Sequence, residues 1–580
     1  MPPVSSGLRI LRSGRLPEFG VQGLATGIAV ILVLLPLLFL VLTSFRTAPL
    51  HSAGEWTLAN YGRVGEQELA QLVLNSLRMA VTCLVVALLL GVSLAWLITR
   101  TNMPAARWLE NLVLAPMLLS PLVGAIAWHL LANERVGLLN KWTLSLFDAS
   151  AFDINSLGGM GWVMGLYYAP YIYLFVSGAL KSMDPSLEES ARVCGASATR
   201  MTRTIALPLV LPAILSGGLL VFILAVEQFG IPLVLGMHKG IYVLPTRIWA
   251  LMSLRPSDYG LAAVLAVLLM ATMAFGVFLQ RRMTENHSYA TVTGKGFRPR
   301  LFDLGRYRHV AIVFCLIYVL LAIVLPYAVL LITSLSRYSG AYWPPTLANY
   351  AQVFDMPMFW RAVWNSLVLS IVGATLAMLL TSLVAFIIHR TRWRLRGTLD
   401  YLTTIPVAVP GVVMGVGVLW SWLWLSQHGG PNLYGSIWLL MVACITRFIP
   451  YGVRSASSTL VQIHPELEES SRVCGKGWLT TLVRITFPLL KPGVIAGWLL
   501  LFVIFFRELG MVVLLYTGQS VVLPVLLVEL WAEGTYPAIA ALSLIQALLL
   551  YVLVAAFRRV TGAGLQAETP SIRGGVPVHG

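Results

Sequence analysis

Twelve apolar runs, each long enough to cross a bilayer as a helix, dominate this chain of 580 residues. Backbone polar groups find no water inside a bilayer, so a segment can cross it only as a helix or within a closed barrel. Such runs predict an all-α polytopic membrane protein with twelve transmembrane helices. Gly and Pro interrupt the fourth and tenth runs, which are therefore the least well defined as spans. The runs fall near residues 22–43, 71–98, 109–131, 159–181, 208–236, 259–280, 310–333, 361–388, 399–425, 435–456, 488–516 and 536–557.

The composition excludes a soluble globular protein. Charged residues make up 11% of this chain, against about 25% of a typical soluble domain. The net charge of +16 is no sign of a nucleic-acid partner, because Lys and Arg lie in short loops between the runs, where they would face anionic lipid headgroups. Most of these loops lie inside if the N-terminus is cytoplasmic, which predicts that both termini are in the cytoplasm.

One polar segment occurs twice in this apolar sequence. Pro185-Ser-Leu-Glu-Glu-Ser-Ala-Arg-Val-Cys-Gly195 returns as Pro465-Glu-Leu-Glu-Glu-Ser-Ser-Arg-Val-Cys-Gly475, an offset of 280 residues (469 − 189). In both copies nine residues separate the glycine from an Ile-x-Leu/Phe-Pro sequence. A repeat of this length indicates two homologous halves of six helices each. With an even number of spans, both halves point the same way through the membrane, which places a shared pathway between them.

The repeat and the runs predict five regions. The first residues contain Arg9, Arg12 and Arg15 but no apolar stretch ending in a cleavage site, which favours a cytoplasmic tail over a signal peptide. The regions are the N-terminal tail 1–21, a first half 22–280, a cytoplasmic linker 281–309, a second half 310–557 and a C-terminal tail 558–580.

Each copy of the repeated segment has the features of a short exposed helix on the cytoplasmic side. Asp184 suits the N-cap and Pro185 the first turn, and Glu188 with Glu189 complements the helix dipole. Gly195 permits a sharp turn at the end, and Cys194 is expected to be a small packing residue. A rigid helix presented twice on one face predicts a two-fold-symmetric cytoplasmic partner.

The repeated segment resembles the cytoplasmic signature loop of permeases in binding-protein-dependent ABC importers. The resemblance is carried by Glu-Ser-Ala or Glu-Ser-Ser, then three residues, Gly, nine residues and Ile-x-Leu/Phe-Pro; the serines and Phe487 depart slightly from the family's pattern. It implies two fused copies of the type I importer fold, with each loop forming the helix that sits on an ATPase subunit. The residues it assigns to this coupling are Glu188, Glu189, Ser190, Ala191, Gly195, Glu468, Glu469, Ser470, Ser471 and Gly475.

The chain itself is not expected to do chemistry. The sequence has no Gly-x-x-x-x-Gly-Lys-Ser/Thr phosphate-binding loop, and no catalytic or metal-ligand cluster is recognisable. No cofactor is therefore expected in this chain. The resemblance implies two copies of a cytoplasmic ABC ATPase, which binds the ATP, and an extracytoplasmic substrate-binding protein, in a bacterial inner membrane.

Charged residues inside the apolar runs are expected to face the interior of the bundle. Glu227 and Gln228 lie in the fifth run, and Arg507 and Glu508 take the same places 280 residues later. These four residues are candidates for a pathway or gate in which Glu227 pairs with Arg507 across the halves. The alternative is a buried structural pair, which is also the interpretation given to Arg447.

The substrate is left between several classes. Fusion of two halves, with Glu227-Gln-Phe-Gly230 and Arg507-Glu-Leu-Gly510, resembles the ferric-iron importer branch, while thiamine, polyamine and phosphonate permeases share much of this layout. A secondary transporter with twelve spans is a more distant alternative, which would not need paired docking loops. A membrane enzyme would need clustered His, Asp or Glu residues, which the sequence does not show.

Overall fold

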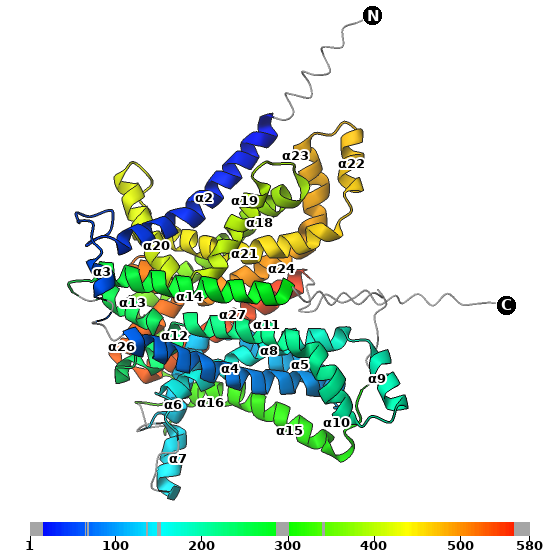
Figure 1. The fold of residues 1–580 in the computed structure, drawn as a ribbon. Coiled ribbons are helices and arrows are strands. Elements are labelled where there is room, and N and C mark those ends of the chain that lie inside the picture. The colour runs from blue at the N-terminus through cyan, green and yellow to red at the C-terminus, as the bar shows by residue number, and fades with distance from the viewer. Residues whose placement is uncertain are drawn as a thin grey trace, which may run out of the picture.

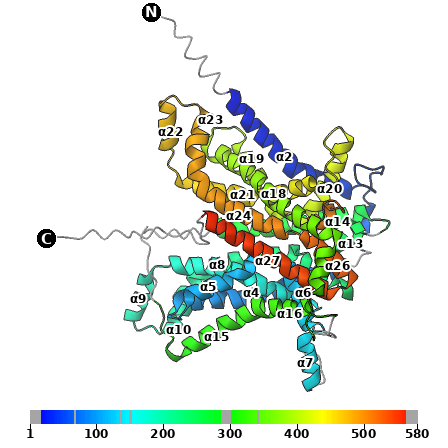
Figure 2. The ribbon, with the colours of Figure 1, turned by 180° about the vertical axis from the view of Figure 1, so that it is seen from behind.

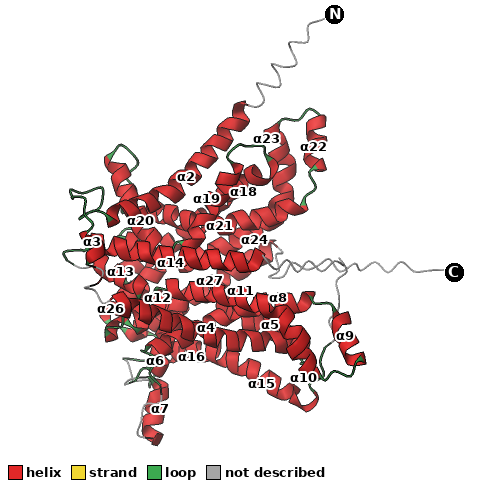
Figure 3. Ribbon diagram, viewed as in Figure 1, coloured by secondary structure: helices red, strands yellow, loops and turns green. Residues whose placement is uncertain are grey.

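The computed structural model describes residues 16–63, 65, 69–134, 137–147, 152–253, 255–285, 301–338 and 343–561. Helices form all of the regular structure in these ranges, without a strand (Figure 3). Among the described residues, ten helices are long and apolar enough to cross a membrane, or up to twelve if two bent pairs each count as one span. This confirms the predicted all-α class. Most of the predicted tails and of the linker lie outside the described residues.

The first half contains these helices: α2 (Leu16–Ser44), α3 (Ala59–Gly62), α4 (Leu69–Arg100), α5 (Ala106–Leu114), η2 (Ala115–Leu118), α6 (Pro121–Ala132), α7 (Leu138–Phe147), α8 (Leu157–Ser182), α9 (Pro185–Val193), α10 (Ala198–Met201), η3 (Thr202–Ala206), α11 (Leu207–Glu227), α12 (Gly230–Leu235), η4 (Met237–Lys239), α13 (Leu244–Ser253) and α14 (Tyr259–Glu285). The second half repeats the same order of long helices (Figure 1).

The helices of the second half, with the turn before it, are η5 (Gly305–Tyr307), α15 (Arg308–Val319), η6 (Leu320–Val324), α16 (Leu325–Ser334), α17 (Ala348–Asp355), α18 (Pro357–Arg390), α19 (Arg396–Thr404), η7 (Ile405–Ala408), α20 (Gly411–Gln427), α21 (Ile437–Gln462), α22 (Glu466–Val473), α23 (Trp478–Thr481), η8 (Leu482–Thr486), α24 (Phe487–Arg507), α25 (Val512–Leu515), α26 (Leu523–Glu533) and α27 (Tyr536–Thr561).

The first helix of each half bridges the two halves. α2 packs against α14 of its own half and α20 of the second half, and α16 packs against α27 of its own half and α6 of the first. Figure 1 shows α2 lying along the second half and α15 and α16 along the first. The halves are therefore interlocked by an exchange of their first helices.

Within each half, the second and fourth spans approach closely through small residues. These are α4 and α8 in the first half and α18 and α21 in the second. A Cβ at Gly161 of α8 would lie 2.5 Å from the Cβ of Thr82 on α4, and one at Gly452 of α21 would lie 2.4 Å from the Oγ1 of Thr381 on α18. Membrane helices gain contact area in this way, because lipid provides no hydrophobic force to press them together. This packing gives each half a firm scaffold.

The third and ninth spans are bent. α5 and η2 meet α6 at 96°, and α19 and η7 meet α20 at 116°. Ser120 and Val409, the residues before Pro121 and Pro410, are extended with ψ of 122° and 114°, which is the conformation that a following proline favours. The fourth and tenth spans are continuous helices despite internal Pro170 and Pro450.

Candidate functional site

The two copies of the repeated segment fold as short helices, α9 and α22, here called the docking helices. The Asp184 side chain accepts a hydrogen bond of 2.9 Å from the Ser186 N–H, so it caps α9 as predicted. At the other end Gly195 and Gly475 have φ of 78° and 72°, a left-handed conformation that costs glycine little. The Ala196 N–H bonds to the Ala191 carbonyl at 3.0 Å, which completes a tight helix-ending turn.

Each docking helix divides the predicted coupling residues between two faces. Glu189 and Glu469 are exposed, as are Ser190 and Ser470, whereas Glu188 and Glu468 are each only 5% exposed. The buried glutamates pair with arginines at the ends of α4 and α18. Ala191 is partly buried and Ser471 is buried. The predicted coupling residues therefore lie on two faces of each docking helix, one exposed and one turned toward the bundle.

The exposed face also carries apolar side chains that sequence reasoning did not single out. Val193 is 89% exposed and Val473 is 87% exposed, at the last positions of α9 and α22. Cys194 and Cys474, which were expected to be packing residues, are exposed as well. The sequence signal that could have found these residues is that valine and cysteine occupy the same positions in both copies of the repeat. The same position is therefore apolar and exposed in both copies of the repeat.

The charged residues inside the bundle come together between the halves. Glu227 is the last residue of α11 and Arg507 the last of α24, so the two positions are structurally equivalent. Glu227 pairs with Arg447 of α21, with 2.6 Å between Oε2 and Nη2, and not with Arg507. Arg447 also donates to the Pro406 carbonyl at 2.9 Å. The pair therefore joins the first half to the bend of the ninth span.

Arg507 makes the reciprocal connection. Its Nη1 donates to the carbonyls of Met117 and Leu119, at 2.5 and 3.0 Å, where the third span bends. Glu508 accepts from the Met511 N–H at 3.3 Å, and the Gln228 side chain accepts from the Phe229 N–H at 3.2 Å. The end of each fifth helix therefore attaches to the bend of the other half, directly in one case and through Arg447 in the other.

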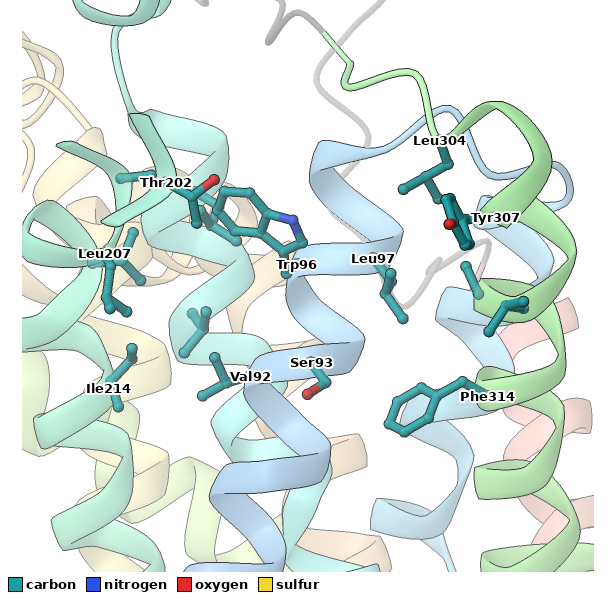
Figure 4. A pocket seen from close by; sticks show the side chains of 16 residues that line it. Val92, Ser93, Trp96, Leu97, Thr202, Leu207, Ile214, Leu304, Tyr307 and Phe314 are labelled. Atoms are coloured by element: carbon teal, nitrogen blue, oxygen red, sulfur yellow. The ribbon is translucent and has the colours of Figure 1, made fainter. Parts of the chain in front are cut away.

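An apolar cavity of about 560 Å³ lies between α4, α8 and α11 of the first half and α15 of the second half. Figure 4 shows Trp96, Leu207, Ile214 and Phe314 among its lining. The lining residues that carry a hydroxyl are Ser93, Thr202 and Tyr307, and such side chains are a poor ligand set for a cation. No group of three or more His, Cys, Asp or Glu residues suited to a metal ion occurs in the part of the chain that the structure describes.

The sequence of this chain is similar to those of several known transport permeases. The chain is 26% identical to the ferric transport system permease protein FbpB of Actinobacillus pleuropneumoniae, across 86% of this chain and 72% of that protein. It is also 26% identical to putative ferric transport system permease protein FbpB 1 of Haemophilus influenzae, across 78% and 71% of the two chains. The spermidine/putrescine permease PotC of Escherichia coli matches 43% of this chain at 26% identity and 93% of its own length.

The family model for the inner membrane component of binding-protein-dependent transport systems matches this chain twice, at residues 83–285 and 382–563. Each match spans most of one half and includes its docking helix, and together they cover more than half of the chain. The duplication predicted from the repeat is thereby confirmed. This chain belongs to the family of inner membrane components of binding-protein-dependent transport systems.

Proposed function

We propose that this chain is the permease of an ATP-driven importer, which takes substrate from an extracytoplasmic binding protein and passes it inward by alternating access. The docking helices carry this proposal, because α9 and α22 project from the same side of the bundle (Figure 2). Two copies of an ATPase subunit would each meet one of them, at Glu189 in one copy and Glu469 in the other. ATP is then bound by that partner.

In this proposal the side with the docking helices is the cytoplasmic side. α2 begins on that side and α14 and α27 end there (Figures 1 and 2). The loop between α18 and α19, with Arg392 and Arg394, belongs to the same side, and a cytoplasmic excess of Lys and Arg is the usual pattern in inner-membrane proteins. Both termini are then cytoplasmic.

Glu227, Gln228, Arg507 and Glu508 form the proposed gate between the halves. Alternating access requires the halves to move against each other. Glu227, through Arg447, and Arg507 each contact the bend of the opposite half by charge-assisted hydrogen bonds. Arg447 joins this set as the partner of Glu227.

Ferric iron is the proposed substrate, as the ion delivered by the binding protein. Two ferric permeases that match most of this chain support it. The match of one half to PotC supports a polyamine as the second candidate. Both candidate substrates are cationic.

The test is reconstitution of the chain in lipid vesicles with the ATPase and binding protein encoded in neighbouring reading frames. We expect co-purification of two ATPase subunits and ATP hydrolysis that rises with ferric-loaded binding protein but not with the iron-free form. Stimulation by spermidine-loaded binding protein instead would replace iron by a polyamine. A chain that concentrates substrate without any ATPase would contradict the importer itself.

A further inference from the structure

The inward faces of the two docking helices are held by the same kind of contact. Arg100 is the last residue of α4 and Arg390 the last of α18. Arg100 forms an ion pair with Glu188, and Arg390 Nε lies 3.5 Å from Glu468 Oε1. Because the pair is present in both halves, it is a built feature of the repeat. We call the two contacts the first and second joints.

Both joints are shielded from water. The side chains of Arg100 and Glu188 are 0% and 6% exposed, and those of Arg390 and Glu468 are 10% and 7% exposed. Desolvating two charges costs about as much as their attraction returns, so such a pair is weak evidence for stability. The pair instead fixes the relative position of the two helices, because removing either partner leaves the other charge buried and unpaired.

The second joint is completed by groups of its own half. Thr486 Oγ1 donates to Glu468 Oε1 at 3.1 Å, and Arg390 Nη2 donates to the Leu460 carbonyl at 2.8 Å. Arg390 therefore connects the ends of α18 and α21 with the docking helix α22. In the first half Ala206 takes the place of Thr486 and cannot make this bond.

The first joint is completed by the segment that links the two halves. The Phe302 ring lies 5.8 Å from the guanidinium of Arg100 and 5.4 Å from that of Arg192 on α9. The backbone N–H of Phe302 donates a hydrogen bond of 2.7 Å to the Arg100 carbonyl. Attraction between a guanidinium and an aromatic face is strongest where water is excluded, so Phe302 connects α4 with the docking helix.

The neighbouring residue Asp303 anchors this segment. Its Oδ1 accepts from the Gly305 N–H at 2.9 Å and from Asn102 Nδ2 at 2.7 Å. These two hydrogen bonds hold the pKa of the Asp303 carboxyl below its usual value, the Gly305 bond having the larger effect. These hydrogen bonds attach the last residues of the linker to the end of α4.

We propose that Glu188 and Glu468 are positioning residues, which fix each docking helix to the long helix of its half and leave Glu189 and Glu469 free to meet the partner, and that Phe302 closes the first joint. The proposal rests on the proposed function for the identity of that partner. The joints transmit a push on α9 to α4, and one on α22 to α18. The linker is then part of the coupling of the first half alone.

The test uses the native Cys194 and Cys474 as label sites, because both are exposed at the ends of the docking helices. In the full chain without ATPase, in lipid nanodiscs, one of them carries a nitroxide and the other four cysteines are replaced by serine or alanine. We expect Glu188→Gln to shift the label at Cys194 from a restrained to a mobile spectrum and to leave the label at Cys474 unchanged. Glu468→Gln should do the reverse.

The matched control is Glu189→Gln, which removes a charge one residue along, on the exposed face. It should leave both spectra unchanged. Phe302→Ala should mobilise the label at Cys194 only, and the exchanged pair Arg100→Glu with Glu188→Arg should restore restraint. Phe302→Ala also keeps the test valid if Glu188→Gln fails to fold.

Equal spectra for the parent and Glu188→Gln, or for the parent and Phe302→Ala should Glu188→Gln not fold, would overturn the joint. A mobilisation of both labels by either change would overturn it too, because the effect would then be general loosening. Association with the ATPase is measured separately on the parent chain. Its absence would refute the proposed function without touching the label result.

Discussion

Glu227 Oε2 and Arg447 Nη2 lie 2.6 Å apart and join the two halves inside the bundle. The residue 280 positions after Glu227 is Arg507, which reaches the opposite bend at the Met117 and Leu119 carbonyls. The same structural position thus contributes an acid in one half and a base in the other. Each contact joins the end of α11 or α24 to the opposite half. Breaking both would release these two helix ends from the opposite half.

Removing one charge of the Glu227 and Arg447 pair should be costly. We expect Glu227→Leu or Arg447→Met to lower the free energy of unfolding by about 3–5 kcal/mol, because the remaining partner stays buried without its counter-charge. The double change Glu227→Leu with Arg447→Met should cost much less than either single change. Thermal unfolding in detergent checks this, and strictly additive losses would show that the pair is not coupled.

Arg507 should not be replaceable by lysine. Its Nη1 donates two hydrogen bonds to the Met117 and Leu119 carbonyls, which lie just before α6 begins, and a bond to a charged group contributes about 1.5–3 kcal/mol. We expect Arg507→Lys and Arg507→Met to be less stable and to transport more slowly. Arg484→Met, at an exposed arginine, is the control. Unchanged transport by Arg507→Met would exclude a gating role.

The ends of the docking helices should be intolerant of side chains. Gly195→Val and Gly475→Val place a branched residue at a positive φ, where it costs about 1–2 kcal/mol per residue. The double variant should insert into the membrane but lose ATPase association and uptake. Gly477→Ala, where a Cβ meets nothing within 4 Å, should behave as the parent. Full substrate-stimulated ATP hydrolysis in the double variant would contradict a coupling role for these turns.

The proposed orientation can be read by cysteine labelling in intact cells. With Cys194 and Cys474 replaced by serine, Arg394→Cys should react only with reagents that enter the cytoplasm. Ser52→Cys and Gln519→Cys, at exposed positions, should react with a membrane-impermeant maleimide added outside. Labelling of Arg394→Cys from outside would reverse the assignment of the two sides.

The irregular spans show where sequence patterns reach their limit. Pro170 and Pro450 lie within long apolar runs, yet α8 and α21 continue through them, since neighbouring helices can satisfy the freed backbone groups. The breaks occur at Pro121 and Pro410, each soon after the 3-10 turn that contains Pro116 or Pro406. Proline spacing alone does not mark these breaks, because Pro208 and Pro212, four residues apart, both lie within the continuous helix α11.

The sequence by itself determined the helices, their approximate number, the duplication and the two docking helices. Each of these depends on local matters: the length of an apolar run against the thickness of a bilayer, a repeated motif, a cap and a glycine. The partner of Glu227 was decided by the tertiary structure, because Arg447 reaches it from a helix 220 residues away in sequence. The division between Glu188 and Glu189 was decided there too. Adjacent residues on a helix point about 100° apart, so only the packing of α9 against α4 and the linker settles which of the two is buried.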